Sequence, residues 1–165
     1  MTVTIRHADR AELADIVRLL ADDPLGRARE RYESPLPAAY ERAFDAIDAD
    51  PNNELVVACC DGTLAGVLQL TFLPNLTYCG RWRAQIEGVR VARAFRSRGV
   101  GRRLFGWAID RARERDCHLV QLTTDRTRPE ARAFYAALGF TASHDGLKLH
   151  LGGSGRRSDG GARHE

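Results

Sequence analysis

The feature that most constrains this chain is a short run of arginine and glycine between a predicted strand and a predicted helix. It reads Arg96-Ser97-Arg98-Gly99-Val100-Gly101 and continues into Arg102 and Arg103. Two glycines let the backbone close on a ligand, and the free amides and dipole at the start of a helix attract anions. The turn therefore suits a pyrophosphate, although glycine turns also precede helices in proteins that bind no phosphate.

Two familiar phosphate-binding motifs do not fit this turn. A P-loop is excluded because no Gly-Lys-Ser/Thr triplet follows the glycines. The dinucleotide fingerprint is excluded because Leu104 stands where its third glycine would be needed. The kind of cofactor must therefore be argued from the surrounding sequence.

That surrounding sequence predicts a mixed α/β domain. Strands are expected over residues 3–6, 54–60, 64–72, 82–91, 119–123, 140–142 and 147–151. Helices are expected from Asp9, after Pro37, over residues 101–116 and over residues 128–138, with a polar loop over residues 22–37. Asp9 and Glu12 form a variant of the capping box, Thr127 is expected to cap the last helix and Gly139 to end it. The last two strands are expected to form a hairpin.

Length and composition place these elements in one domain. The chain has 165 residues, and we expect the domain to span residues 1–151 and the glycine-rich residues 152–165 to be a flexible tail. No apolar run is long enough for a membrane span, no secretory signal is visible and the four cysteines lack a disulfide or zinc spacing, so we expect a cytoplasmic protein that does not bind membranes. The net charge of +3 comes almost wholly from arginine, and we expect no nucleic-acid partner.

Two blocks of sequence carry a resemblance to a known family. Val89-Arg90-Val91 followed by the glycine turn resembles the cofactor-binding core of the GNAT family of N-acetyltransferases. The block from Ala131 to Phe140 resembles the later helix and strand of the same family. The resemblance implies a GNAT-like α/β fold: a mixed, mostly antiparallel central sheet with flanking helices, splayed after Val91 and Leu122 to admit acyl-CoA.

The resemblance also implies which residues hold acetyl-CoA, the co-substrate. The backbones of Val89 and Val91 would pair with the pantetheine arm, and the amides from Arg98 to Arg103 would bind the pyrophosphate. Arg128 stands where the family often has asparagine, and it either reaches a phosphate or is simply solvated. The full set of expected cofactor-binding residues is Val89, Val91, Arg96, Arg98, Gly99, Val100, Gly101, Arg102, Arg103, Thr124, Arg128, Ala131 and Phe134.

Acylation of an amine needs a group that takes up its proton, and Glu87 is our candidate. Its alternation with Val89 and Val91 predicts that all three side chains share one face of the sheet, where partial burial would raise the pKa of Glu87. The alternative is a structural ion pair with a nearby arginine. By resemblance, Tyr135 protonates the departing thiolate, although its helical spacing is equally consistent with packing in the core.

The remaining candidates for chemistry are weak. Ser143 and His144 are adjacent and should point to opposite faces of an extended segment, and no cysteine has the motif of a nucleophile, so we expect direct attack without an acyl-enzyme. The histidines show no ligand spacing, so no metal site is expected.

A weaker resemblance bears on the acceptor. The aminoalkylphosphonate acetyltransferase branch shows a similar order of short segments, which here are residues 50–52, 87, 123–124, 132–135 and 143–144. In the loop over residues 22–37, Arg27, Arg29 or Arg31 would suit an anionic acceptor, whereas Asp22 and Asp23 would suit a cationic amine. Acetylation of a small primary amine leads; acetylation of a peptide or protein and a non-catalytic acyl-CoA sensor are the alternatives. The family also makes a homodimer an expectation.

Overall fold

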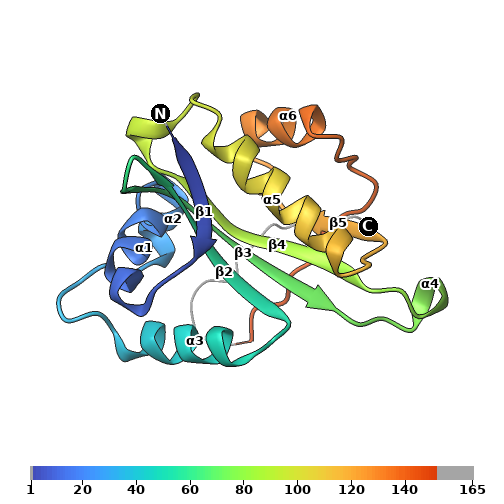
Figure 1. Ribbon diagram of the computed structural model, residues 1–165, viewed down its shortest axis with the longest axis horizontal. Coiled ribbons are helices and arrows are strands. Elements are labelled where there is room, and N and C mark those ends of the chain that lie inside the picture. The colour runs from blue at the N-terminus through green and yellow to red at the C-terminus, as the bar shows by residue number, and fades with distance from the viewer. Residues whose placement is uncertain (1, 152–165) are drawn as a thin grey trace, which may run out of the picture.

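The computed structural model describes residues 2–151 and arranges them around one five-stranded sheet (Figure 1). The predicted tail over residues 152–165 lies outside the described residues. The strands are β1 Val3–His7, β2 Asn53–Cys60, β3 Thr63–Leu73, β4 Arg83–Val91 and β5 Leu119–Leu122. The helices are α1 Leu13–Leu20, α2 Pro24–Arg29, α3 Ala38–Ala49, α4 Thr77–Gly80, α5 Val100–Glu114 and α6 Pro129–Ala137.

The sheet is mostly antiparallel, as predicted. Its strands follow sequence order, β1 to β5, and only the last pair, β4 and β5, is parallel. That ladder runs only from Arg83 opposite Leu119 to Ile86 opposite Leu122. Beyond Ile86, β4 pairs with β3 alone, so on β4 the strands separate before Glu87 rather than after Val91.

A β-bulge lies where β4 leaves β5. Arg90 faces Val67 on β3 and Glu87 faces Gln69, so Gly88 and Val89 together oppose a single residue of β3. Gly88 adopts φ +61°, a left-handed conformation that glycine reaches without strain. The extra residue reverses the alternation of side chains along the rest of the strand.

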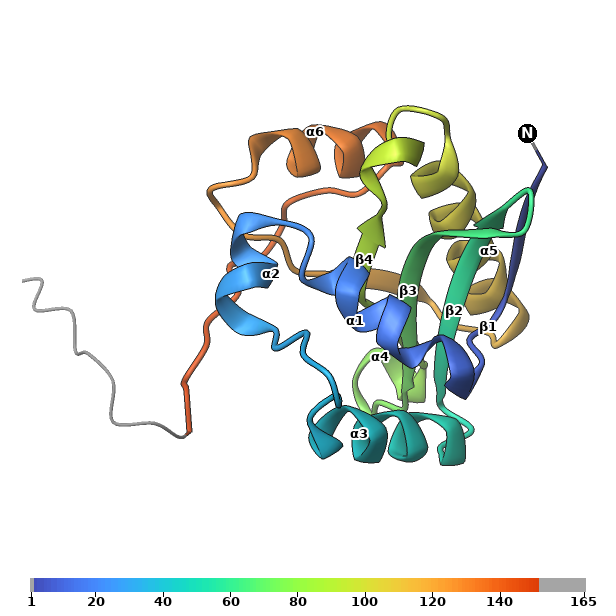
Figure 2. The same cartoon turned by 90° about the vertical axis from the view of Figure 1, so that its left-hand side faces the viewer.

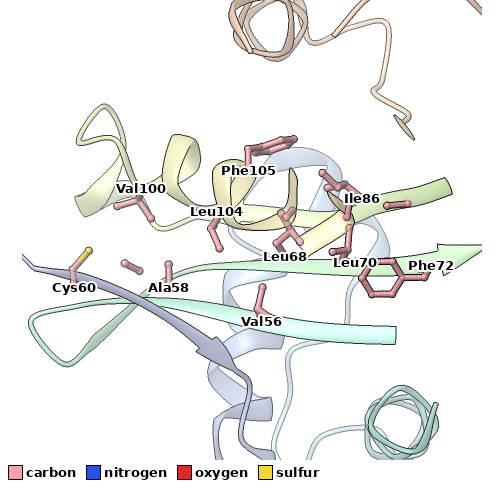
Figure 3. Packing of buried hydrophobic residues seen from close by; sticks show 14 residues of the cluster. Val56, Ala58, Cys60, Leu68, Leu70, Phe72, Ile86, Val100, Leu104 and Phe105 are labelled. Carbon is pink, nitrogen blue, oxygen red and sulfur yellow. The ribbon is translucent and has the colours of Figure 1, made fainter. Parts of the chain in front are cut away.

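The two faces of the sheet are covered by different helices. On one face α5 buries Leu104 and Phe105 against Val56, Leu68 and Ile86 in the larger hydrophobic cluster (Figure 3). On the other face α1 packs Ile16 and Leu19 against Val57 and Val67, and α3 adds Phe44 to Leu13 and Val17. Figure 2 shows α1 and α2 side by side on this second face. The sheet is thus a middle layer between helices. The candidate site lies where β4 and β5 separate.

Most local signals are confirmed, and the exceptions have physical reasons. The capping box of Asp9 and Glu12 is present, but Thr127 does not cap α6 because its hydroxyl and amide bond to Asp125. Part of the predicted loop forms α2, which begins at Pro24 after the cap residue Asp23.

The predicted C-terminal hairpin is wrong for the described residues. Residues 140–142 and 147–151 form no strand in the part of the chain that the structure describes. The side chains of Leu147, Leu149 and Leu151 are 93%, 85% and 92% exposed, so their alternation is not matched by a buried face. Alternation predicts a strand only where a neighbouring strand and a core are available to receive it.

A buried carboxylate ties α5 to β2. Glu54 is only 5% exposed, and Arg111 donates to it through Nε at 2.9 and 3.1 Å. Replacing Arg111 with methionine would leave this charge buried and unpaired. We expect a loss of roughly 2 kcal/mol in the free energy of unfolding, less than for a fully enclosed pair because the Arg111 side chain is one-third exposed.

Chemical denaturation would measure that loss. Arg113→Met is the matched control, because Arg113 lies on the same helix and pairs with Asp110 while 74% exposed. A change within a few tenths of a kcal/mol is expected for the control. Equal losses in both variants would show that the Glu54 pair has no special role.

Candidate active site

The glycine turn connects β4 to α5 with two residues in left-handed conformations. Ser97 has φ +59° and Gly99, the N-cap of α5, has φ +81°. No side chain caps the helix from that position, so the first amides of a fifteen-residue helix are not used by an N-cap side chain. A backbone bent in this way directs amides into a concave surface that suits an anion.

The glycine at the second helical position lets the helix start approach its neighbours. A Cβ on Gly101 would lie 3.4 Å from the ring of Phe134 on α6 and 3.8 Å from a methyl group of Val91 on β4. The turn, the end of β4 and α6 therefore meet at one place. Val100, on the opposite side of the helix start, is buried in the core.

Four arginines surround the turn and leave it positively charged. All four are exposed: Arg96, Arg98, Arg102 and Arg103. Among residues 2–151 no carboxylate lies within ion-pair distance of any of them. Arg96 Nε donates to the carbonyl oxygen of Val91 at 3.1 Å, which fastens the turn to the end of β4. Amides, dipole and charge all suit a pyrophosphate.

The unpaired stretch of β4 offers an edge beside the turn. Val89 and Val91 are half-buried, and their side chains pack with the α5 cluster. Their strand has no β5 partner there, so backbone groups on that edge can pair with an extended ligand. Two further expected cofactor-binding residues are half-buried: Thr124, which follows β5, and Ala131, in the first turn of α6.

The predicted position of Glu87 needs correction. The bulge at Gly88 places Glu87 and Arg90 on one face and Val89 and Val91 on the other, whereas uninterrupted alternation predicted that Glu87 would share a face with the valines. Glu87 is exposed, and no arginine among the described residues pairs with it. The partial burial expected around this carboxylate is therefore not found.

Tyr135 lies in an aromatic cluster on α6 and α5. Its ring centroid is 5.5 Å from that of Phe105, 5.7 Å from Phe134 and 6.2 Å from Phe140. Burial raises the pKa of Tyr135 above its ordinary value, against the opposing charges of Arg128 and Arg90. The ring thus packs as a core residue would, and its hydroxyl stays protonated at neutral pH.

An ion network that the sequence did not reveal lies close to Tyr135. Asp23 Oδ2 is 3.2 Å from Arg90 Nε and 3.9 Å from Arg128 Nη1, and Asp23 also accepts a hydrogen bond from the amide of Gly26. Burial alone would raise the pKa of Asp23, but the Gly26 amide and the Arg90 guanidinium lower it overall. The one available signal was Arg90 itself, a charged residue between two valines of a strand.

Ser143 and His144 lie closer together than predicted. The Ser143 hydroxyl is 2.8 Å from His144 Nδ1, because the segment is not a strand that would point them apart. Both side chains are exposed. Within residues 2–151 no group of three or more metal-ligating side chains is found, and no helix there is long and apolar enough to cross a membrane.

This geometry agrees with the comparisons to known proteins. The chain matches the Acetyltransferase (GNAT) family over residues 14–140 and belongs to that family. Family membership implies acetyl-CoA as the acetyl donor.

Individual relatives indicate the class of enzyme. An aminoalkylphosphonate N-acetyltransferase of Salmonella typhimurium is 29% identical over 140 residues, which cover 85% of this chain and 86% of the relative. An uncharacterized N-acetyltransferase of Archaeoglobus fulgidus is 28% identical over 151 residues, which cover 92% and 97%. A crystal structure described as a transcriptional regulator from Bacillus halodurans is 59% identical, with a TM-score of 0.88 and coverage of 91% and 100%. Family and relatives identify the chain as an acetyl-transferring enzyme.

Proposed function

We propose that this protein acetylates the primary amine of a small molecule by direct attack on the thioester of acetyl-CoA. The observation that carries the proposal is the uncapped, positively charged start of α5 beside an unpaired edge of β4. The first feature suits a pyrophosphate and the second an extended arm. Acetyl-CoA, when bound, supplies an activated acetyl group attached through sulfur.

We assign the proton transfers to two side chains. Tyr135 donates its hydroxyl proton to the departing sulfur, a role that its protonated state and its packing against the same hydrophobic cluster as Val89 and Val91 support. Glu87 accepts the amine proton through water; its exposure supports a solvent-connected route rather than direct contact. The bulge turns Glu87 toward the face of the sheet on which α1 packs, away from α5. We expect the acceptor to approach from this face.

The space beside the site supports a small acceptor. The loop over residues 22–37 contains α2, which packs tightly against α1: a Cβ on Gly26 would lie 2.1 Å from the carbonyl oxygen of Leu20. A held segment of this kind favours a small acceptor over a peptide that needs an open groove. The name of the Salmonella typhimurium relative makes an aminoalkylphosphonate the first acceptor to try.

Release of free thiol from acetyl-CoA across a panel of amines tests the proposed function. The panel contains aminoalkylphosphonates, polyamines, aminoglycosides, amino acids and short peptides. We expect saturable release with one class of small amine, and mass spectrometry should find one acetyl group on that amine. Release with peptides alone would contradict a small-molecule acceptor.

A non-catalytic acyl-CoA sensor is the second candidate, and the description of the Bacillus halodurans protein as a transcriptional regulator favours it. A sensor would bind acetyl-CoA saturably and release no thiol with any amine. Calorimetric binding measured beside the panel therefore separates the two functions.

We also propose a homodimer in the cytoplasm. The exposed Leu147, Leu149 and Leu151 support an interface, since exposed leucines close together on one segment are unusual in a monomer. Light scattering on the full chain and on Leu149→Asp would test this, with loss of the dimer expected for the variant. A monomeric full chain would contradict it.

A further inference from the structure

A network of three charged side chains, here called the Asp23 cluster, consists of Asp23, Arg90 and Arg128. The transfer of an acetyl group does not itself require such a network. The side chains of Arg90 and Asp23 are only 12% and 13% exposed, whereas that of Arg128 is 42% exposed. They come from β4, the N-cap of α2 and the N-cap of α6. Three separate elements thus bring charged groups into one partly buried place.

The cluster carries more positive than negative charge. Besides Arg90 and Arg128, Arg29 also acts on the Asp23 carboxylate, and the negative groups that face Arg90 are Asp23 and Glu30. One positive charge is therefore left in excess. Burial lowers the pKa of Arg90, because removal from water disfavours its charged form. A ligand that brings a negative charge would offset this cost.

Arg90 also has a donor that is poorly satisfied. Its Nε is buried and forms no hydrogen bond in the described chain, although the nearest oxygen of Asp23 is 3.2 Å away, because the alignment of donor and acceptor is poor. Its Nη1 donates to the carbonyl oxygen of Val89 at 2.7 Å, which holds the guanidinium in place. A buried donor that is satisfied only by this poorly aligned ion pair can bind a better-placed anion.

The position of the cluster points to the acceptor rather than to the acetyl donor. Arg90 lies between Val89 and Val91, the two residues whose backbones suit the donor's arm, but its side chain is on the opposite face. Arg128 lies at the N-cap of α6, the helix that carries Tyr135, and the charges of Arg90 and Arg128 oppose the rise that burial causes in the pKa of Tyr135. An anion at the cluster would thus sit close to the reacting groups, away from the start of α5.

We propose that Arg90 and Arg128 bind an anionic group of the amine acceptor, a phosphonate, phosphate or carboxylate, and that Asp23 is the counter-ion they hold without it. The proposal rests on the proposed function and names the residues that select its acceptor. Asp23 faces two guanidinium groups and the Gly26 amide, so it is not available to a cationic amine. Arg90 and Arg128 act here as specificity-determining residues.

The first test compares acceptors that share an amine and differ in charge: 2-aminoethylphosphonate, β-alanine and propylamine. In the wild type, kcat/KM should favour one or both anionic amines, and the better one identifies the anion. Arg90→Gln should reduce that preference by about 30-fold, and Arg128→Gln, at a half-exposed position, should reduce it about 5-fold. Arg18→Gln, which removes an exposed arginine paired with Asp15 on α1, should leave it unchanged.

Asp23→Asn should raise the activity with anionic acceptors, whereas Arg90→Gln should lower it. Asparagine can still accept the hydrogen bond from Gly26, so the cap of α2 is kept while the charge is removed. The competing counter-ion is then gone, and kcat/KM for anionic acceptors should rise about 3-fold. A structural role alone would make both Arg90→Gln and Asp23→Asn less active with every acceptor.

A binding measurement separates this inference from the proposed function. Calorimetry with ethylphosphonate and with propionate, which carry no amine, should show binding that Arg90→Gln weakens at least about 10-fold and Asp23→Asn strengthens. If the wild type acetylates no amine but shows these binding changes, the proposed function fails and the anion site stands. If propylamine is acetylated as well as the anionic amines and Arg90→Gln changes no preference, the anion site is wrong and the function stands.

Discussion

Gly99→Glu is expected to weaken acetyl-CoA binding by at least about 100-fold, which corresponds to about 2.7 kcal/mol. The substitution places a carboxylate at the N-cap of α5, where the amides and arginines should meet a pyrophosphate. Like charges then repel across the site, and the new side chain fills the concave turn. Isothermal titration calorimetry with acetyl-CoA measures the change.

Gly80→Glu is the matched control for this experiment. Gly80 has φ +75°, close to the +81° of Gly99, and a Cβ at either position would meet no atom within 4 Å. It precedes β4, at the end of the strand opposite the turn, so the variant bears the same backbone strain without touching the site. A folded Gly99→Glu that binds acetyl-CoA as tightly as Gly80→Glu would overturn the cofactor assignment.

Tyr135→Phe is expected to lower kcat by about 100-fold with little change in acetyl-CoA affinity. The ring keeps its contacts with Phe105, Phe134 and Phe140, so the variant removes only the hydroxyl. Without that proton the thiolate departs less readily. Steady-state kinetics and a calorimetric Kd measure the two effects separately.

Two further readouts identify the role of the hydroxyl. A donor whose thiol is more acidic leaves without help, so the loss in Tyr135→Phe should shrink with such a thioester. Tyr78→Phe, at an exposed tyrosine of α4, serves as the control and should keep full turnover. An equal loss with both thioesters would remove Tyr135 from the acid role and leave it a packing residue.

Local sequence signals predicted the elements around the proposed acetyl-donor site. The glycine turn and α5 each follow from neighbouring residues: a glycine that adopts a left-handed conformation and an apolar face at helical spacing. Such signals need no knowledge of distant partners. The family resemblance, now confirmed, rested on Val89 to Val91 with the glycine turn and on the block from Ala131 to Phe140.

The surroundings of Glu87 and Asp23, where we propose that the acceptor binds, could not be predicted in the same way. The bulge at Gly88 depends on the register of β4 against β3, and one inserted residue was enough to place Glu87 on the opposite face from Val89. The Asp23 cluster joins residues far apart in sequence, so neither Asp23 nor Arg90 shows its partner in the local pattern. Contacts of this kind depend on tertiary packing, which composition and periodicity do not encode directly.

A crystal structure of the protein with acetyl-CoA would test the central claim most directly. We predict that the pyrophosphate accepts hydrogen bonds from backbone amides between Arg98 and Arg103, and that the pantetheine arm runs along Val89 and Val91 where β4 has left β5. The sulfur should then lie next to the Tyr135 hydroxyl. Acetyl-CoA bound elsewhere, with the start of α5 empty, would contradict the account.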